Sequence, residues 1–168
     1  GLKIEGKSIN WANAGKAAGI GVSCHYSKYS LWEATAGDIT IDSGTVNATG
    51  SSYSGGYGGP GIGGGSNVSN ITISGGTVTA ASGYQSSGCA AIGSAYGHSG
   101  KKHIVISGGT VKATGGSAGI GGGAYASADV TITGGNVTAI SKGYGAGIGS
   151  GGGDYVSDGA KGGSITIT

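Results

Sequence analysis

The strongest constraint on this chain is an internal repeat, because copies of one short unit bury their apolar faces by stacking on one another. A ten-residue segment like ITISGGTVTA recurs, and its copies begin at residues 2, 39, 71, 104 and 130, with a sixth start at residue 165. The steps between successive starts vary from 26 to 37 residues. Loops of different length are therefore attached to a constant scaffold.

Apolar and polar residues alternate within each copy. A threonine separates Ile71 from Ile73, and another separates Val78 from Ala80. Alternation with a period of two is typical of a β-strand that buries one face. Ser/Thr-Gly-Gly or a close variant stands between the two strands, and glycine there suits a tight turn with positive φ. Each copy is thus predicted to be two short strands joined by a turn, with the aliphatic residues inside.

A third short strand follows each copy in a Gly-Ile-Gly-like motif. Its central residues are Ile20, Ile62, Ile92, Ile120 and Ile148. Three strands per coil, one tight turn and two variable loops predict an all-β fold, a parallel three-sided β-solenoid of about five coils. A right-handed path is the default for parallel crossovers. We expect residues 1–168 to form this single solenoid domain.

The third strand has a second predicted property, which is its lack of side chains. Glycine or alanine flanks the central isoleucine, so we expect a strip of nearly bare backbone on the outside, which another surface can approach closely. Both ends of a solenoid also expose unpaired strand edges. The sequence therefore predicts that a loop, a neighbouring chain or a second copy of the chain packs on the Gly-Ile-Gly face. The open coil ends are expected either to continue into further coils of the parent protein or to contact another molecule end to end, so self-association is predicted through the Gly-Ile-Gly face or through the coil ends.

Composition excludes several classes of function. Glycine accounts for 43 of 168 residues, but it shows no strict three-residue period, which excludes collagen. Only 10% of the residues are charged and the net charge is +2, so we expect no nucleic acid as a partner. Because the chain has no apolar run of about 18 residues, we expect no membrane insertion.

The repeats resemble those of a known group of proteins. The strings ISGGTVTA (residues 73–80) and AGIGGG (residues 118–123) are similar to β-solenoid repeats of large surface proteins from Gram-positive and gut bacteria, which are often described as carbohydrate-binding or adhesin-like. The resemblance covers essentially the whole chain. It implies an extracellular or cell-surface module whose partner is a glycan or a host or cell-surface protein. Because the repeat starts almost directly after Gly1, we expect a fragment of a longer extracellular protein.

Aromatic residues in the variable loops are the candidate binding residues. Flat rings stack on sugars and also pack on protein surfaces, and loops on a rigid scaffold are where binding residues concentrate. The glycan- or surface-binding candidates are Tyr26, Tyr29, Trp32, Tyr96, Tyr125 and Tyr155. The competing interpretation is that each ring only covers loop backbone.

Catalysis is not predicted. Hydrolysis by paired carboxylates requires two acids that converge across a cleft, and the aligned repeats supply no such pair. No serine has an indicated His–Asp partner. Asp154 and Asp158 in the last long loop are candidate calcium ligands, and no other cofactor is expected.

A polar residue stands directly before the first strand of each coil. The column consists of Asp38, Asn70, His103, Asp129 and Ser164. Short polar side chains at such positions often bond backbone N–H groups. We therefore predict that this column caps turns.

Two alternatives compete with adhesion or glycan binding. One is a passive structural stalk or spacer, in which the repeats only provide length. The other is ice binding, because outward positions are rich in threonine, as in the column of Thr45, Thr77 and Thr110. Lys112 and Val105 interrupt neighbouring columns, which is unfavourable for a flat ice-binding face.

Overall fold

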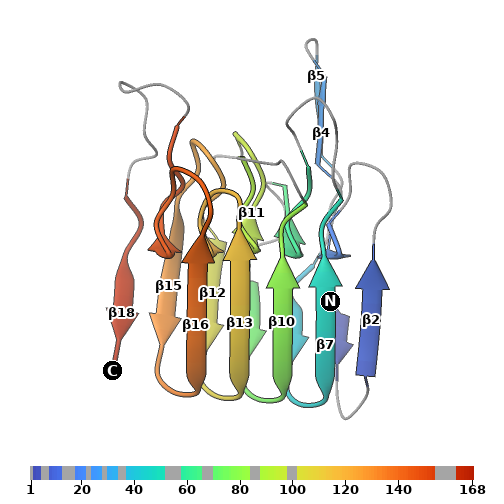
Figure 1. Cartoon of the computed structure of the whole chain (residues 1–168), viewed down its shortest axis with the longest axis vertical. Coiled ribbons are helices and arrows are strands. Elements are labelled where there is room, and N and C mark those ends of the chain that lie inside the picture. Colours follow the sequence, from blue (N-terminus) through green and yellow to red (C-terminus); the bar gives the residue numbers. More distant parts are fainter. Residues whose placement is uncertain are drawn as a thin grey trace.

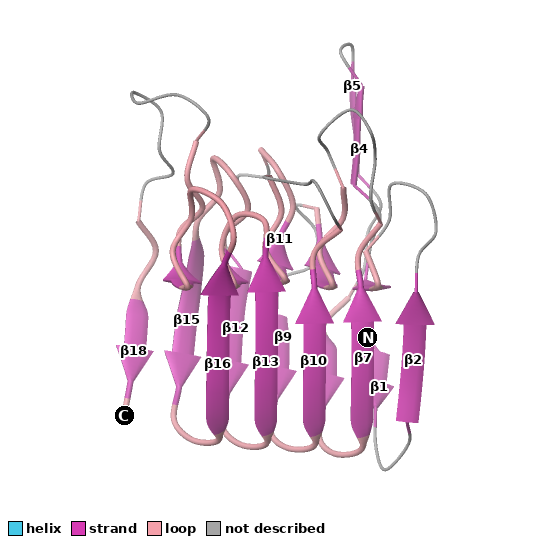
Figure 2. Cartoon of the chain, in the orientation of Figure 1, coloured by secondary structure: helices cyan, strands magenta, loops and turns pink. Residues whose placement is uncertain are grey.

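The computed structural model describes eleven segments of the chain. They are residues 2–4, 8–12, 18–21, 24–27, 30–33, 37–51, 58–65, 70–83, 88–97, 102–153 and 162–168. Within these segments the chain consists of strands, turns and loops and has no helix (Figure 2). Three parallel sheets stack the coils side by side, which confirms the predicted three-sided β-solenoid.

Each sheet collects one strand from every coil. The first sheet contains β1 (Leu2–Ile4), β6 (Ile39–Ile41), β9 (Asn70–Ile73), β12 (Lys102–Ile106), β15 (Ala128–Ile132) and β18 (Ile165–Ile167). The second contains β2 (Ser8–Ala12), β7 (Thr45–Thr49), β10 (Thr77–Ala81), β13 (Thr110–Gly115) and β16 (Asn136–Ser141). The third contains β3 (Ile20–Gly21), β8 (Ile62–Gly64), β11 (Ile92–Ser94), β14 (Ile120–Gly121) and β17 (Ile148–Gly149). Five complete coils result, and β18 adds a sixth strand to the first sheet alone.

The path of the chain is right-handed, as expected for parallel crossovers. In Figure 1 the strands of the second sheet lie in front and point up, those of the first sheet lie behind and point down, and the coils advance from right to left. The tight turns between the first and second strands form one edge. The other connections emerge at the opposite edge, for example residues 116–119 and 122–127 of the fourth coil. We call this second edge the loop-bearing edge.

The core is a stack of identical layers. Strands pair like with like, so Ile73 lies beside Ile106, and Val78 lies beside both Val46 and Val111. These side chains are completely or almost completely buried. Repetition of one aliphatic layer therefore replaces the large core that a globular domain would need.

The turn between the first and second strands adopts the predicted backbone conformation. Each of these turns contains a Gly-Gly or Ser-Gly pair, and the second residue of the pair has φ between 83° and 91°. These residues are Gly44, Gly76, Gly109 and Gly135. This left-handed conformation costs a residue with a Cβ about 1–2 kcal/mol. Glycine recurs here for that reason.

The Gly-Ile-Gly strip differs from the bare outer surface that the alternation predicts. Gly61, Ala91 and Gly119 are buried. The glycine after the central isoleucine has φ near 130°, and a Cβ on Gly63 or Gly93 would lie about 2 Å from the carbonyl oxygen of the next coil's glycine. The glycines thus allow adjacent coils to approach each other. Self-association through this face remains a prediction.

Candidate functional site

Two of the predicted binding residues lie in a regular hairpin and not in an irregular loop. Tyr26 belongs to β4 (Cys24–Ser27) and Trp32 to β5 (Ser30–Glu33), and the two strands pair antiparallel. Figure 1 shows the hairpin projecting from the loop-bearing edge, beyond the other strands. The aromatic-rich segment of the first coil is therefore held away from the stacked sheets.

The hairpin register separates its two aromatic positions. Tyr26 stands opposite Leu31, and His25 stands opposite Trp32. Residues directly opposite each other share a face of a β-ribbon, and consecutive residues alternate between faces. Tyr26 and Trp32 therefore occupy positions on opposite faces of the ribbon. One flat ligand cannot cover both positions from one side.

The remaining predicted residues divide into two groups. Tyr29, Tyr155, Asp154 and Asp158 lie outside the described residues, so the calcium prediction stays a prediction. Tyr96 and Tyr125 are described, and they occupy equivalent turns after β11 and β14, in the third and fourth coils. These two tyrosines are the part of the candidate site whose geometry is established.

Tyr96 and Tyr125 are brought together by the coil repeat. Their ring centroids lie 5.4 Å apart with an interplanar angle of 76°, an edge-to-face arrangement. Such a pair contributes about 0.5–1.5 kcal/mol beyond the area it buries. Both residues are only partly buried. The pair therefore forms a small aromatic surface at the loop-bearing edge.

One side of the Tyr96 ring is occupied by the protein itself. A Cβ built on Gly88 would lie 2.6 Å from the Cδ2 atom of Tyr96, so the ring lies against the Gly88 backbone. The same turn is held by Gly97, whose N–H donates to the carbonyl of Ala124 at 2.8 Å. For Tyr96 the interpretation as a cover for loop backbone is thus partly correct. Tyr125 is the better candidate for contact with a ligand.

Tyr125 also has an unusual backbone. Its φ is 61°, and within the described segments it is the one non-glycine residue with positive φ. A left-handed conformation at a bulky residue costs about 1–3 kcal/mol, and such strain concentrates at functional sites. Sequence patterns do not reveal this feature, because left-handed positions are normally recognised by Gly, Asn or Asp. The left-handed conformation of Tyr125 therefore lowers the stability of the fold, and the ring is present despite this cost.

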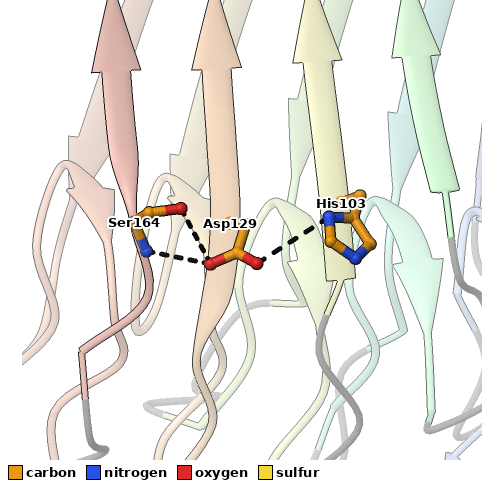
Figure 3. Close-up of polar contacts among 3 residues, drawn as sticks. All are labelled: His103, Asp129 and Ser164. Carbon is orange, nitrogen blue, oxygen red and sulfur yellow. Dashed lines mark hydrogen bonds and ion pairs between the residues drawn. The ribbon is translucent and has the colours of Figure 1, made fainter.

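The polar column before the first strand links neighbouring coils. Asn70 Nδ2 donates to Asp38 Oδ1 at 2.8 Å. Asp129 Oδ1 accepts both the backbone N–H of Ser164 at 2.9 Å and its hydroxyl at 3.0 Å (Figure 3). The bond to the backbone N–H is the predicted capping interaction. The side-chain hydrogen bonds also link the start of β6 to the start of β9, and the start of β15 to the start of β18.

His103, Asp129 and Ser164 lie in one row but do not form a catalytic triad. His103 Nδ1 is 3.8 Å from Asp129 Oδ2, and the Ser164 hydroxyl bonds the other carboxylate oxygen (Figure 3). The carboxylate therefore stands between the imidazole and the hydroxyl. A nucleophilic serine requires the histidine as its direct hydrogen-bond partner. This row holds strands together and does not activate Ser164.

The repeat architecture matches a known family. A family model described as a beta helix repeat matches residues 39–66, 71–96, 104–124 and 130–152, which together exceed half of the 168 residues. The chain belongs to the beta helix repeat family. Each matched segment corresponds to one coil, from the second to the fifth. Comparisons with curated proteins and with solved structures gave no match.

This beta helix repeat chain also buries a lysine. The Lys102 side chain is fully buried, and its Nζ donates a hydrogen bond to the carbonyl oxygen of Gly65, the residue that follows β8. Lys102 shares the inward-facing positions of β12 with Ile104 and Ile106, which are also buried. Sequence analysis did not single it out, although the alternation contains the signal. The buried Lys102 side chain therefore links β12 to the residue that follows β8.

Two further properties of the beta helix repeat chain bear on function. Among the residues whose structure is described, no three His, Cys, Asp or Glu side chains are grouped as metal ligands would be. The same residues include no helix that is long and apolar enough to cross a membrane.

Proposed function

We propose that the chain is a non-catalytic, extracellular beta helix repeat module that binds a glycan through aromatic residues at its loop-bearing edge. The observation that carries this proposal is the Tyr96–Tyr125 pair, in which Tyr125 keeps a ring at a strained left-handed position. The strands repeat too regularly to form a unique site. The loops differ from coil to coil and present the rings.

The arrangement suits a ligand that extends along the solenoid. The hairpin leaves the first coil and the Tyr96 turn leaves the third, and coils are spaced about 4.8 Å apart. A chain of sugar residues that runs along the loop-bearing edge would therefore meet aromatic residues of several coils. Weak contacts at each coil would add to one another, as in other multivalent binding. Aromatic rings stack on the apolar faces of sugars, and nearby polar groups bond the hydroxyls.

The substitution Tyr125→Gly removes the ring and also relieves the backbone strain at this position. In Tyr125→Gly the left-handed conformation becomes favourable, which offsets the lost contact with Tyr96. We expect the free energy of unfolding to change by less than about 1 kcal/mol. Glycan binding should weaken about ten-fold, the equivalent of 1.4 kcal/mol. A glycan array followed by calorimetric titration of the best glycan measures the effect.

The control is Lys112→Ala, which removes an exposed side chain from the outer face of β13, away from the loop-bearing edge. Its glycan affinity should equal that of the unmodified chain. Trp32→Ala tests the hairpin in the same way as Tyr125→Gly tests the turn. Unchanged binding in both Tyr125→Gly and Trp32→Ala would place the site elsewhere, and an array without any bound glycan would favour the stalk.

Ice binding is a second candidate function, because threonines form a row on the outer face of the second sheet. Thr45, Thr77 and Thr110 are exposed and stand in register on three adjacent strands of the second sheet. Lys112 interrupts the neighbouring row, beside Thr79. If this face binds ice, Lys112→Thr should increase thermal hysteresis relative to the unmodified chain. Absence of hysteresis in both proteins at millimolar concentration would exclude this function.

A further inference from the structure

Three serine hydroxyls are buried without a hydrogen-bond partner in the described part of the chain. They belong to Ser51, Ser94 and Ser117, which are at most 1% exposed. A buried polar group that lacks a partner is costly, and native proteins usually satisfy it with another protein group or with an ordered water molecule. Each hydroxyl therefore needs either a partner or a reason to lack one.

Ser117 is packed directly against backbone. A Cβ built on Gly151 would lie 2.6 Å from the Ser117 Oγ atom, and a Cβ built on Gly145 would lie 2.6 Å from the Ser117 carbonyl carbon. Glycine at these two positions allows the chain to close over the serine. The Ser117 hydroxyl is thus tightly enclosed, and it provides a control for Ser94.

Ser94 has a different environment, which the fifth coil reveals. Ser94 ends β11, and Ser150 follows β17 at the equivalent position. Ser150 Oγ accepts a hydrogen bond from the N–H of Gly163 at 3.3 Å. By register, Gly163 is equivalent to Ala128, which pairs with Lys102. A hydroxyl at this position therefore faces the start of the next first-sheet strand, which for Ser94 is Lys102.

The side chain of Lys102 brings its ammonium to the same place. Its Nζ donates to the carbonyl oxygen of Gly65. Gly65 directly follows Gly64, the register partner of Ser94, and the N–H of Ala95 donates to the Gly64 carbonyl at 3.2 Å. The ammonium and the Ser94 hydroxyl, both completely buried, therefore lie beside the same short stretch of chain.

The two polar side chains occur together in the repeats. In the next coil Gly122 and Ala128 stand at the equivalent positions, and both are buried. In the aligned sequence, Ser94 and Lys102 are the one pair with a polar side chain at both positions. Polar groups are costly in an interior unless they are hydrogen-bonded, so their joint occurrence indicates an interaction. The Ser94 hydroxyl nevertheless forms no direct bond with Lys102.

We propose that one buried water molecule joins the Ser94 hydroxyl to the Lys102 ammonium. An ammonium has three N–H donors, of which the bond to Gly65 uses one. Water can accept from the ammonium and donate to the hydroxyl and to the second lone pair of the Gly65 carbonyl. A buried water typically has about three polar partners, and these groups supply them. An anion suits the place less well, because it would face the carbonyl oxygen.

The proposed water would link three strands of the solenoid. Ser94 ends β11, Lys102 begins β12 and Gly65 follows β8. Ser94 also lies two residues before Tyr96, so the site is next to the turn that carries this ring. The site is structural and does not depend on the proposed binding of a glycan.

Removal of the two hydroxyls should have opposite effects. Ser94→Ala takes away one partner of the water and should lower the equilibrium constant for folding about ten-fold. Ser117→Ala removes a hydroxyl that has no partner and should raise that constant. Alanine is close to serine in size, so packing changes little in either variant. Urea unfolding measures both constants. A Ser94→Ala variant that is as stable as the unmodified chain, or more stable, would overturn the proposal.

A double-mutant cycle tests whether Ser94 and Lys102 share the water. In a Lys102→Met background the water has lost its strongest donor, so Ser94→Ala should cost much less than in the unmodified chain. Additive effects of the two substitutions would contradict a shared water, because independent sites add.

A crystal structure of the whole chain, grown with bromide in place of chloride, identifies the occupant. We expect an oxygen-like density peak within hydrogen-bond distance of Ser94 Oγ and Lys102 Nζ, without an anomalous signal from bromine. An anomalous peak at this position would assign the site to a halide ion. A direct hydrogen bond between Ser94 and Lys102, with no density between them, would exclude a bridging molecule. Either of these two results overturns the water site.

Discussion

Replacement of Gly93 by alanine is expected to destabilise the solenoid by more than about 4 kcal/mol. Gly93 has φ of 134°, and its Cβ would lie 1.9 Å from the carbonyl oxygen of Gly121 in the next coil. The obstacle is backbone, which cannot move aside without separating the coils. Loss of close packing and of the inter-coil hydrogen bonds would follow. Urea unfolding monitored by circular dichroism measures the change through the transition midpoint.

Gly97→Ala is the matched control for this substitution. Gly97 also has a left-handed φ, of 69°, but a Cβ there would meet no atom within 4 Å. Its cost should be limited to backbone conformation, about 1–2 kcal/mol. A similar loss of stability in both variants would show that backbone conformation, and not the approach of adjacent coils, explains the glycine at position 93.

The alternation of inward and outward residues does not predict the surroundings of the glycines in the Gly-Ile-Gly motif. The copies, the inward isoleucines and the turn glycines such as Gly76 were all predicted, because each follows from local alternation or local φ. Alternation also assigned the flanking glycines to the outside. The glycine after the isoleucine, for example Gly63 or Gly93, instead has φ near 130° and faces the carbonyl of the next coil. Contacts between coils are not encoded in the spacing within one coil.

The candidate site was harder to predict than the fold. β4 and β5 pair as a hairpin, but the sequence between them, Lys28-Tyr29, lacks the Asn-Gly or Asp-Gly signal of a two-residue hairpin turn. The aromatic residues of the loops were recognised by type. Their pairing was not, because Tyr96 and Tyr125 belong to different coils and meet only through the register of β11 and β14.

Reversal of the buried charge at Lys102 is expected to be the second most damaging change. In Lys102→Glu a carboxylate replaces the ammonium that donates to the Gly65 carbonyl, so two acceptors face each other in a site without solvent. An unpaired charge buried in this way costs about 3–5 kcal/mol. The same urea titration, compared with that of the unmodified chain, measures the loss.

Two controls separate charge from shape and from position. Lys102→Met keeps most of the side-chain volume and removes the charge. It loses mainly the hydrogen bond to Gly65, which is worth about 1–3 kcal/mol. Part of this loss is offset because the variant no longer buries an ammonium group. Lys112→Glu makes the same charge reversal on the exposed face of β13 and should change stability by no more than about 0.5 kcal/mol. The expected order of destabilisation is Lys102→Glu, then Lys102→Met, then Lys112→Glu. If Lys102→Glu were as mild as Lys112→Glu, the side chain at position 102 would have to reach solvent, and the buried bond that links β12 to Gly65 would contribute nothing to stability.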